Sequence, residues 1–530
     1  MTVEQWLNND ELAITIWKNK YRFEEESLDE WFKRVSGGNK IIEEYIRTKK
    51  FIFGGRILAN RGLSNRNRKI TYSNCYVIAP PEDNLESIFE CGAKLARTFS
   101  YGGGCGIDIS NLRPSGAKVN NAAKTTSGAV SFMDFYSYIT GLIGQSGRRG
   151  ALMISISCDH PDLEEFIELK SDLDKVTKAN ISVRVSDKFM EAVIQGKTLI
   201  LKFVTDAGEV ITKEVEAYPI FRKLAQMNWD YAEPGILFWD MITNWNLLSN
   251  NKEFSYAGVN PCAEEPLPAG GSCLLGSINL AEFVTSQGQL DIISLRETIK
   301  AAVIALNEVL DEGLPLHPLK EQRESVRDWR QIGLGVMGLA DMFIKLKVKY
   351  GSETSLRILD TIGHELIMTA LETSSELAEE YGAFPRFDRD GVLKTKFFKS
   401  LDSGDMNDFR FQDLHERIHK YGLRNSQLLT CAPTGSIATM LGVSTGCEPI
   451  FATSYTRKTE SLVNEEKYYK VYTPIIKELI DEGFQEDSLP AYVVTSEQIP
   501  YTERISVQAT LQNYIDASIS STINLPESAT

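Results

Sequence analysis

The sequence predicts an α/β fold, and three observations lead to that class. From about residue 70 onward, short apolar segments typical of strands alternate with amphipathic segments typical of helices. The first 50 residues show helical patterns only. The chain has 530 residues, of which 42% are hydrophobic, and this is enough to build a large core. We therefore expect a helical N-terminal region over residues 1–50 and one large α/β domain, with much parallel sheet, over residues 51–530.

The helical N-terminal region contains a clear helix start. Ser27 and Glu30 have the spacing of a capping box, in which the two side chains satisfy backbone amides of the first turn. The apolar residues that follow form one helical stripe, made of Leu28, Trp31, Phe32 and Val35.

Strands and helices are expected to alternate between residues 70 and 205. Asp83 is expected to cap a helix, and the glycine-rich stretch Gly102–Gly106 is expected to form a loop. The expected strands are residues 75–78, 151–157, 181–185 and 199–204. The expected helices begin near residues 84, 131 and 162.

The second half of the chain is expected to hold two long helices. One is opened by a capping box from Ser294 to Glu297, and the other runs over residues 355–381 and ends at Gly382. We expect further strands at residues 427–431 and 518–525.

Charge and composition exclude several functions. The net charge of −15 argues against nucleic acid as a partner, although a small anion can still bind through backbone amides at helix N-termini. The N-terminus lacks a signal-peptide pattern, and the sequence has no apolar run long enough to span a membrane, so we expect a cytoplasmic protein. The eight cysteines include no CxxC pair, and the five histidines show no metal-ligand spacing with them, so we expect no metal site.

Four glycine- or arginine-containing motifs admit more than one interpretation. Gly333–Gly338 matches GxGxxG, but the preceding segment is too polar for a buried strand, so close backbone packing is favoured over dinucleotide binding. Gly102–Gly106 suits either a ligand approach or a plain turn. Thr434–Ser436 suits either a phosphate cradle or a capped helix. Arg148 and Arg149 suit either phosphate recognition or a solvated loop.

The stretch from Asn260 to Cys273 combines two thiols, a carboxylate and an amide, and its prolines and glycines exclude regular structure. Cys262 and Glu264 are two residues apart, so in an extended chain their side chains share a face, roughly 6–7 Å apart. We expect a redox or radical site here. Of the other cysteines, Cys105 and Cys431 have no chemical partner in the sequence. Three more are assigned to packing, namely Cys91, Cys158 and Cys447.

Taken together, the motifs resemble those of the large catalytic subunit of ribonucleotide reductases. In family order they are Ser73 to Cys75, Gly102 to Gly106, Asn111 to Pro114, Arg148 to Ala151, Asp159 to Phe166, Asn260 to Glu264, Gly271 to Leu280, Ile332 to Gly338, Ala432 to Ile437 and Thr522 to Pro526. The resemblance implies a ten-stranded α/β barrel made of two five-stranded halves, with a central finger loop and, in this chain, a helical N-terminal layer.

The resemblance also implies roles for individual residues. Cys262 would become the thiyl radical that takes the 3′-hydrogen of the ribose, Glu264 would act as base on the 3′-hydroxyl, and Asn260 would bind the ribose. Cys75 and Cys273 would supply two electrons and close to a disulfide. The substrate would be lined by Asn74, Gly104, Pro433, Thr434, Gly435, Ser436 and Ile437. An allosteric specificity site would involve Asp83, Arg113 and Arg148.

The short spacing from Cys262 to Cys273 and the segment from Asp159 to Asp162 look like the adenosylcobalamin-dependent class. The implied partners are a ribonucleotide, a dNTP or ATP effector, a dithiol reductant such as thioredoxin and a second copy in a homodimer. One alternative is a class I large subunit that needs a separate radical-generating subunit; another is an inactive nucleotide-binding fragment. A glycyl-radical enzyme is disfavoured, because no glycine follows Gly483. We also expect that no ATP-cone domain precedes the barrel, and that the family's C-terminal barrel end and tail are missing.

Overall fold

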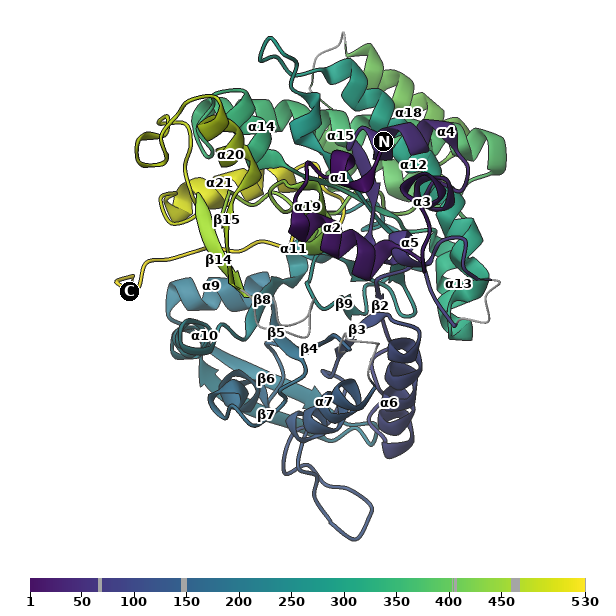
Figure 1. Cartoon of the computed structure of the whole chain (residues 1–530). Helices are drawn as coiled ribbons and strands as arrows, with labels where there is room; N and C mark the ends of the chain where they lie inside the picture. Colours follow the sequence, from purple (N-terminus) through teal and green to yellow (C-terminus); the bar gives the residue numbers. More distant parts are fainter. Residues whose placement is uncertain (65–68, 144–149, 403, 405–407, 459–467, 530) are drawn as a thin grey trace. The chain divides into compact units, whose positions relative to one another are not determined.

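The computed structural model describes residues 1–64, 69–143, 150–402, 404, 408–458 and 468–529 (Figure 1). The chain folds into two compact units, each built from separate stretches of sequence. The first unit contains residues 1–73, 274–316 and 329–530, and the second unit contains residues 74–273 and 317–328. The expected N-terminal helical region, residues 1–50, lies in the first unit.

The second unit is organised around a six-stranded sheet. Five of its strands are parallel, as the alternation of strand and helix patterns predicts, and one antiparallel strand is added at an edge. In sheet order the strands are β11 (Ser272–Cys273), β2 (Cys75–Val77), β3 (Gly104–Asp108), β4 (Leu152–Ser157), β5 (Asn180–Val185) and β8 (Gly235–Phe238).

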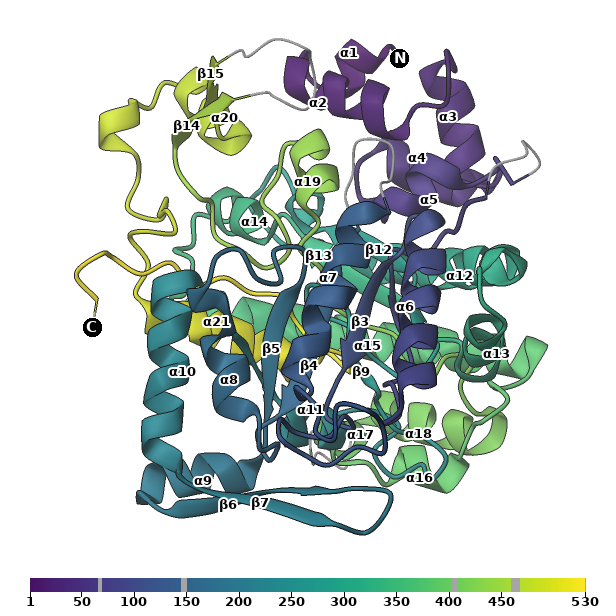
Figure 2. The same cartoon turned by 90° about the horizontal axis from the view of Figure 1, so that it is seen from below.

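The two faces of this sheet bury different partners. Side chains alternate along a strand, so on β3 Cys105 and Ile107 face one side, where they join a large apolar core. Helices cover that side and stand in a row across the strands (Figure 2). They are α6 (Leu85–Ser100), α7 (Met133–Leu142), α8 (Leu163–Glu168) and α10 (Ala217–Tyr231). On the other side, Gly104 and Gly106 lie beneath a hairpin of β9 (Gly258–Val259) and β10 (Pro266–Leu267).

Glycine explains why this hairpin can lie directly on the sheet. A Cβ atom on Gly106 would lie 1.7 Å from the carbonyl oxygen of Val259, and one on Gly104 would lie 3.1 Å from Cγ of Pro261. The bare backbone of β3 is therefore needed for the hairpin to approach. The expectation that the whole Gly102–Gly106 stretch is a loop was wrong, because Gly104 and Gly106 belong to strand β3.

Other expectations for the second unit need small corrections. Helix α6 is capped by Asn84, whose side chain accepts a hydrogen bond from the Ser87 amide, and not by Asp83. The strand expected at residues 199–204 exists, but it forms an antiparallel two-stranded ribbon, β6 (Thr198–Val204) with β7 (Val210–Glu216), apart from the parallel sheet. The remaining helices are α9 (Asp187–Gln195), α11 (Trp239–Asn244) and α13, which begins in this unit (Lys320–Trp329).

The first unit has a second set of strands. β12 (Leu275–Asn279) pairs antiparallel with β1 (Phe51–Phe53) and parallel with β13 (Gly333–Met337). Single parallel bridges continue the set, from Leu334 to Leu429 and from Cys431 to Ile519. The segments expected to be full strands at residues 427–431 and 518–525 thus form only bridges. The GxGxxG motif is strand β13, and a Cβ on Gly335 would lie 2.2 Å from the Thr430 carbonyl oxygen, which confirms close backbone packing.

Helices pack around this set. The two long ones lie side by side, and α15 (Glu353–Tyr381) ends at Gly382 as expected. α12 (Ile292–Gly313) begins earlier than expected, because Asp291 and not Ser294 is its cap. The other helices and strands here are α5 (Gly55–Asn60), α14 (Leu339–Lys345), α16 (Arg389–Leu393), α17 (Lys396–Ser400), α18 (Phe409–Tyr421), α19 (Gly435–Leu441), β14 (Ser454–Lys458), β15 (Tyr468–Tyr472), α20 (Pro474–Asp481) and α21 (Tyr501–Gln512).

The N-terminal part of the first unit is helical, as expected. Its elements are α1 (Val3–Trp6), α2 (Glu11–Ile16), the π-helical turn η1 (Trp17–Tyr21), α3 (Leu28–Val35) and α4 (Lys40–Arg47). The capping box of Ser27 and Glu30 is confirmed, and the predicted stripe of α3 is buried. Trp31 is the centre of an aromatic cluster with Trp6, Trp17 and Phe32.

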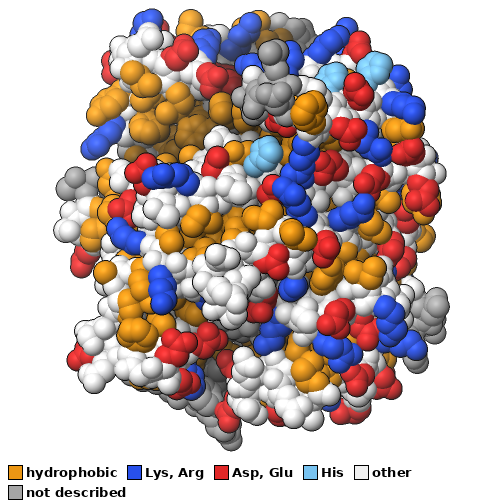
Figure 3. Space-filling view, turned by 90° about the horizontal axis from the view of Figure 1, so that it is seen from above, with side chains coloured by type: hydrophobic (Ala, Val, Ile, Leu, Met, Phe, Trp, Pro, Cys, Tyr) orange, Lys and Arg blue, Asp and Glu red, His pale blue; other side chains and the backbone are white. Residues whose placement is uncertain are grey.

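In the described residues, no helix is long and apolar enough to cross a membrane. The face shown in Figure 3 carries acidic and basic side chains mixed with one another, and apolar side chains gather over parts of it.

The close approach of β9 to β3 predicts a strong position dependence for glycine substitution. Gly106→Ala should lower the free energy of unfolding by about 1–3 kcal/mol, because the new methyl group overlaps the Val259 carbonyl. Gly258→Ala in the same hairpin is the matched control, since its Cβ would meet only Val77 Cγ1, at an ordinary 3.5 Å. Urea unfolding of both variants measures the difference, and equal stabilities would contradict this account.

Candidate active site

The tip of the β9–β10 hairpin is a compact turn built on Asn260. The buried Asn260 side chain accepts a hydrogen bond from the Glu265 amide through Oδ1 at 3.0 Å. Its backbone amide donates to the Glu265 carbonyl at 3.1 Å, and its carbonyl accepts from the Ala263 amide at 3.0 Å. Asn180 of β5 donates from Nδ2 to the Pro261 carbonyl at 3.0 Å, which fastens the turn to the sheet. The residues between β9 and β10 are therefore held in one conformation.

This turn separates the side chains of Cys262 and Glu264. Ala263 between them has φ of +65°, in the left-handed region, so the chain is not extended there. The expectation that the two side chains share the face of an extended chain was therefore wrong. Cys262 is exposed at the tip, whereas Glu264 is buried and only 2% exposed. The two groups differ in access to solvent although they are neighbours in sequence.

The buried carboxyl group of Glu264 has a pKa close to neutral pH. Desolvation raises the pKa of Glu264 to about 7, while hydrogen bonding by Asn260 and by the backbone opposes the shift. A carboxyl group with such a pKa can accept and release a proton near pH 7, as a general acid or base must. The pKa of the Cys262 thiol is also raised, because protein atoms crowd its sulfur although the residue has an exposed surface, and further because Glu264 lies nearby.

Cys75 and Cys273 face each other across two adjacent strands. They are direct register partners in the antiparallel pair β2–β11. The Cα atoms of such partners are about 4.5–5.5 Å apart, which lies within the range that a disulfide requires. Both are free thiols. The pKa of Cys273 is raised well above its usual value, first by the hydrogen bond with the Cys75 thiol and then by burial.

Two other groups lie near this thiol pair but on the opposite face of the sheet, because Cys75 is the register partner of Gly104 whereas Tyr76 and Cys105 point into the apolar core. The buried Cys105, on β3 next to β2, has a raised pKa because of burial and the neighbouring Cys75 thiol. The Tyr76 hydroxyl lies 2.9 Å from Nδ1 of His317, whose burial lowers its pKa to about 4 and thereby favours the neutral ring. Asn74 accepts a hydrogen bond from the Gly104 amide through its carbonyl at 2.8 Å. Asn74 and Gly104, two predicted substrate contacts, thus lie together beside Cys75.

The remaining predicted substrate residues, Pro433–Ile437, belong to the first unit. Thr434 is the N-cap of α19 with φ of +50°, and its Oγ1 accepts a hydrogen bond from the Gly446 amide at 2.9 Å. Among the described residues, and apart from its chain neighbours and the backbone of its own helix, no atom would lie within 4 Å of a Cβ on Gly435. The loop is thus strained, tied back at Thr434 and open above Gly435.

Two of the three predicted allosteric residues lie together. Arg113 donates from Nε to Asp83 Oδ2 at 2.8 Å, and its backbone amide donates to Asp83 Oδ1 at 2.9 Å. The same contacts suit a structural ion pair. Arg148 lies outside the described residues.

Sequence reasoning missed two arrangements in the first unit. Cys447, assigned to packing, lies beside Cys431, for which no partner could be named from the sequence. This contact and Arg504 lower the pKa of Cys447. Tyr21, which was not singled out, donates a hydrogen bond to the side chain of Ser436 at 2.8 Å. Both contacts join residues with no sequence pattern in common, so only the fold could reveal them.

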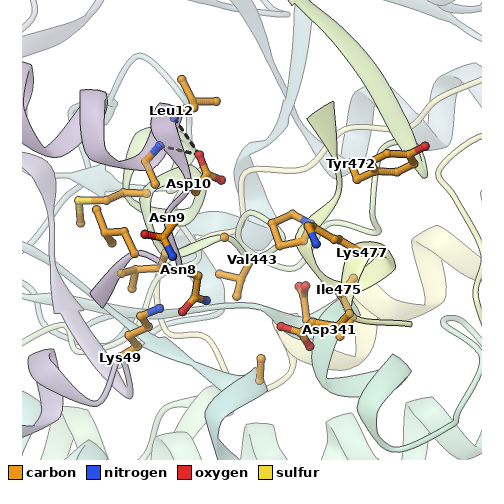
Figure 4. A pocket seen from close by; sticks show the side chains of 18 of the residues that line it. Asn8, Asn9, Asp10, Leu12, Lys49, Asp341, Val443, Tyr472, Ile475 and Lys477 are labelled. Carbon is orange, nitrogen blue, oxygen red and sulfur yellow. Dashed lines mark hydrogen bonds between the residues drawn. The ribbon is translucent and has the colours of Figure 1, made fainter. Parts of the chain in front are cut away.

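A cavity of about 650 Å³ lies in the first unit and not at the Cys262 turn. Asn8, Asn9 and Lys49 line one side of it, and Asp341 lies on another (Figure 4). Burial lowers the pKa of Lys49 and raises that of Asp341, and the Asp341 carboxylate accepts a hydrogen bond from the Ser444 amide. The lining residues are all different from the predicted site residues.

Comparison with known proteins adds independent evidence. A family model described as the ribonucleotide reductase barrel domain matches residues 73–530, which is most of the chain. The chain belongs to the ribonucleotide reductase family. The match begins just before β2 and includes both the Cys262 turn and the Pro433–Ile437 loop, which supports the resemblance drawn from the motifs.

Curated relatives have the same family name. The chain is 32% identical to the vitamin B12-dependent ribonucleoside-diphosphate reductase of Thermoplasma acidophilum, over 94% of this chain and 63% of the relative. It is also 32% identical to a protein of the same description from Mycobacterium tuberculosis strain CDC 1551 / Oshkosh, over 86% and 64%. Identity to the ribonucleoside-diphosphate reductase large chain of Cryptosporidium parvum is 26%, over 80% and 56%. The chain thus spans somewhat less than two thirds of the length of these relatives.

The raised pKa of Glu264 predicts a pH-dependent stability. A carboxyl group whose pKa is higher in the folded than in the unfolded chain weakens folding as pH rises from about 4.5 to 7. Between pH 5 and pH 8, Glu264→Gln should therefore gain roughly 2–3 kcal/mol in unfolding free energy relative to wild type. The buried Asp516, whose pKa is also about 7, affects both proteins equally and cancels in the comparison. Urea unfolding at the two pH values measures the gain, and a pH-independent difference would show that Glu264 is not desolvated.

The register of β2 and β11 predicts which thiols can be joined. Treatment with a mild oxidant such as diamide should link Cys75 to Cys273, because they are cross-strand neighbours. Mass spectrometry of unreduced peptides detects the link, and Cys75→Ser should leave Cys273 free. Cys91 and Cys158, buried in the apolar core, should stay reduced and serve as internal controls. Preferential linkage of Cys273 to another cysteine would contradict the register.

Proposed function

We propose that this chain reduces ribonucleotides to 2′-deoxyribonucleotides by thiyl-radical chemistry, in the manner of the adenosylcobalamin-dependent class of its family. The observation that carries the proposal is the arrangement in the second unit. A cross-strand thiol pair, a buried carboxyl group with a pKa of about 7 and an exposed thiol at a rigid turn lie in one unit. Because the chain belongs to the ribonucleotide reductase family, ribonucleotides are the substrates that we propose for these groups.

The first proposed step takes place at the turn. Cys262, as a thiyl radical, removes the 3′-hydrogen atom of the ribose, and Glu264 accepts the proton of the 3′-hydroxyl. Support comes from the exposure of Cys262, which permits contact with a substrate, and from the pKa of Glu264, which suits a base at neutral pH. Asn260 would contact the ribose, and its two hydrogen bonds with Glu265 already fix its position.

The second proposed step is reduction of the substrate at C2′. The C2′–O bond breaks and the 2′-hydroxyl leaves as water with one proton, while C2′ gains a hydrogen in its place; Cys75 and Cys273 together supply the two protons and two electrons, and a bond forms between their sulfur atoms. Cys262 then returns its hydrogen atom to C3′. The face-to-face thiols support this step, because little movement is needed to join them. An external dithiol such as thioredoxin would restore the pair by exchange.

The cofactor proposal follows from the relatives' names, which include vitamin B12 dependence. When bound, adenosylcobalamin supplies a radical that can take the hydrogen atom of a thiol. Cys262 fits this chemistry, since it is the exposed one of the eight cysteines and stands at the tip of a turn. It is the residue of this chain that would face the cofactor.

The substrate loop and the regulatory partners are proposed on the same basis. Pro433–Ile437 would hold the substrate phosphates, while Asn74 and Gly104 would lie against the nucleoside. A dNTP or ATP effector would bind near Asp83, Arg113 and Arg148, and a second copy of the chain would pair there. The two strand sets, five parallel strands in one unit and five strand or bridge segments in the other, support a ten-stranded barrel as the complete architecture. Residues 51–530 would form that barrel domain.

Turnover assays test the proposed function. With CDP, adenosylcobalamin and dithiothreitol, the wild-type chain should form dCDP, and Cys262→Ser should lower the rate roughly a thousandfold or more while CDP binding persists. Cys158→Ala is the control, because it removes a buried thiol away from the turn. The assay is run with and without a supplied C-terminal segment of a relative.

Each other outcome identifies a different function. Turnover without adenosylcobalamin, or only with a separate radical-generating subunit, would support the class I alternative. CDP binding without turnover under every condition would support a nucleotide-binding piece. Full activity of Cys262→Ser would exclude the radical role of that residue.

A further inference from the structure

Tyr21 links the N-terminal region to the proposed phosphate loop. Its hydroxyl donates a hydrogen bond to Oγ of Ser436 at 2.8 Å, although the two residues are 415 positions apart in the sequence. Tyr21 is only 1% exposed, whereas Ser436 is partly exposed. The contact therefore runs from the buried interior of the first unit to the accessible side of the loop.

The Tyr21 ring is held rigidly. Tyr21 is the last residue of the π-helical turn η1, and such turns are frequent at functional sites. Its carbonyl accepts hydrogen bonds from Trp31 Nε1 and Arg34 Nη2, both at 3.0 Å. Gly55 leaves room for the ring, since a Cβ there would lie 3.2 Å from the hydroxyl oxygen. These contacts fix the direction in which the hydroxyl points.

A donated hydrogen bond has a consequence for Ser436. Because Oγ accepts the Tyr21 proton, the hydrogen of the Ser436 hydroxyl must point elsewhere, and it is polarised for donation to an acceptor. Open space above the adjacent Gly435 gives such an acceptor room. Thr434, the other hydroxyl of the loop, is oriented separately by the Gly446 amide.

The residues before Tyr21 also lie near α19. Helix α2, just before Tyr21, packs against α19. Asn8 and Asn9, just before α2, line the cavity of Figure 4 together with Leu441 and Val443 at the far end of α19. This N-terminal segment thus packs against α19 through α2, and it contacts the loop before α19 through the Tyr21 hydroxyl.

We propose that Tyr21 is a positioning residue for substrate binding, which orients the Ser436 hydroxyl toward a phosphate of the nucleotide. The proposal rests on the proposed function of the Pro433–Ile437 loop. Tyr21 lies before residue 73, where the family match begins, so this contribution comes from a part of the chain that the family model does not include.

Tyr21→Phe tests the proposal, because it removes only the hydroxyl and keeps the ring. Loss of one hydrogen bond that organises the loop should weaken binding of CDP about three- to tenfold. Binding of cytidine, which has no phosphate, should not change. Isothermal titration with each ligand measures both values. Tyr45→Phe is the matched control, since Tyr45 lies in the same N-terminal region but its hydroxyl bonds to Thr298 of α12 and not to the loop.

A double-mutant cycle separates positioning from a general structural role. Ser436→Ala should weaken CDP binding, and Tyr21→Phe should add nothing further in that background. An equal loss in both backgrounds, or an equal loss for CDP and cytidine, would overturn the proposal. If wild type binds CDP and Ser436→Ala weakens it while Tyr21→Phe does not, only the inference on Tyr21 fails. If wild type does not bind CDP, the proposed function fails and the inference fails with it.

Discussion

The contact on which the candidate site depends is the approach of the Val259 carbonyl to Gly106. It is a backbone-to-backbone contact, so it leaves no space for a side chain at position 106 of β3. The large core on the opposite face and the helices covering it hold β3 in place. The hairpin is thereby seated on a rigid support, and Asn180 from β5 fastens its tip through the Pro261 carbonyl. A reactive group at the tip is therefore held in a fixed position by the sheet, and it moves less than it would on a surface loop.

The turn also resolves a conflict between two chemical needs. Under the proposed function, the thiol of Cys262 must reach its reaction partners, whereas a carboxyl group with a raised pKa must be kept from water. In an extended strand, residues two positions apart share a face, so Cys262 and Glu264 would both be exposed or both be buried. The left-handed conformation of Ala263 avoids this, because it reverses the chain between the exposed Cys262 and the buried Glu264. The cost of the unusual backbone conformation is of order 1–3 kcal/mol, and the hydrogen bonds from Asn260 to Ala263 and Glu265 offset it.

The sequence predicts the elements of this structure better than its long-range contacts. The spacing of apolar residues correctly locates β4, β5 and the buried stripe of α3. This works because the buried face of a strand or helix needs apolar residues at regular positions in the sequence. Gly104 and Gly106, whose role is set by a hairpin more than 150 residues later, were assigned wrongly. Two cap positions were also predicted wrongly. The helices α6 and α12 are capped by Asn84 and Asp291 and not by the nearby Asp83 and Ser294, and the choice between such neighbours depends on the tertiary structure. The motif resemblance named Cys75 with Cys273, whereas nothing local indicated the Tyr21 hydroxyl at Ser436.

The position of the thiol pair in the chain has its own physical meaning. The chain passes between its two units next to Asn74 and again after Cys273, so each cysteine lies within two residues of a crossing point. Within the second unit, the pairing of β2 with β11 already joins these two segments by register. A disulfide between Cys75 and Cys273 would add a covalent bond between β2 and β11, two strands that already pair in the sheet. A thiol pair that must cycle between oxidised and reduced forms therefore gains from a sheet position, since neither form requires the strands to separate.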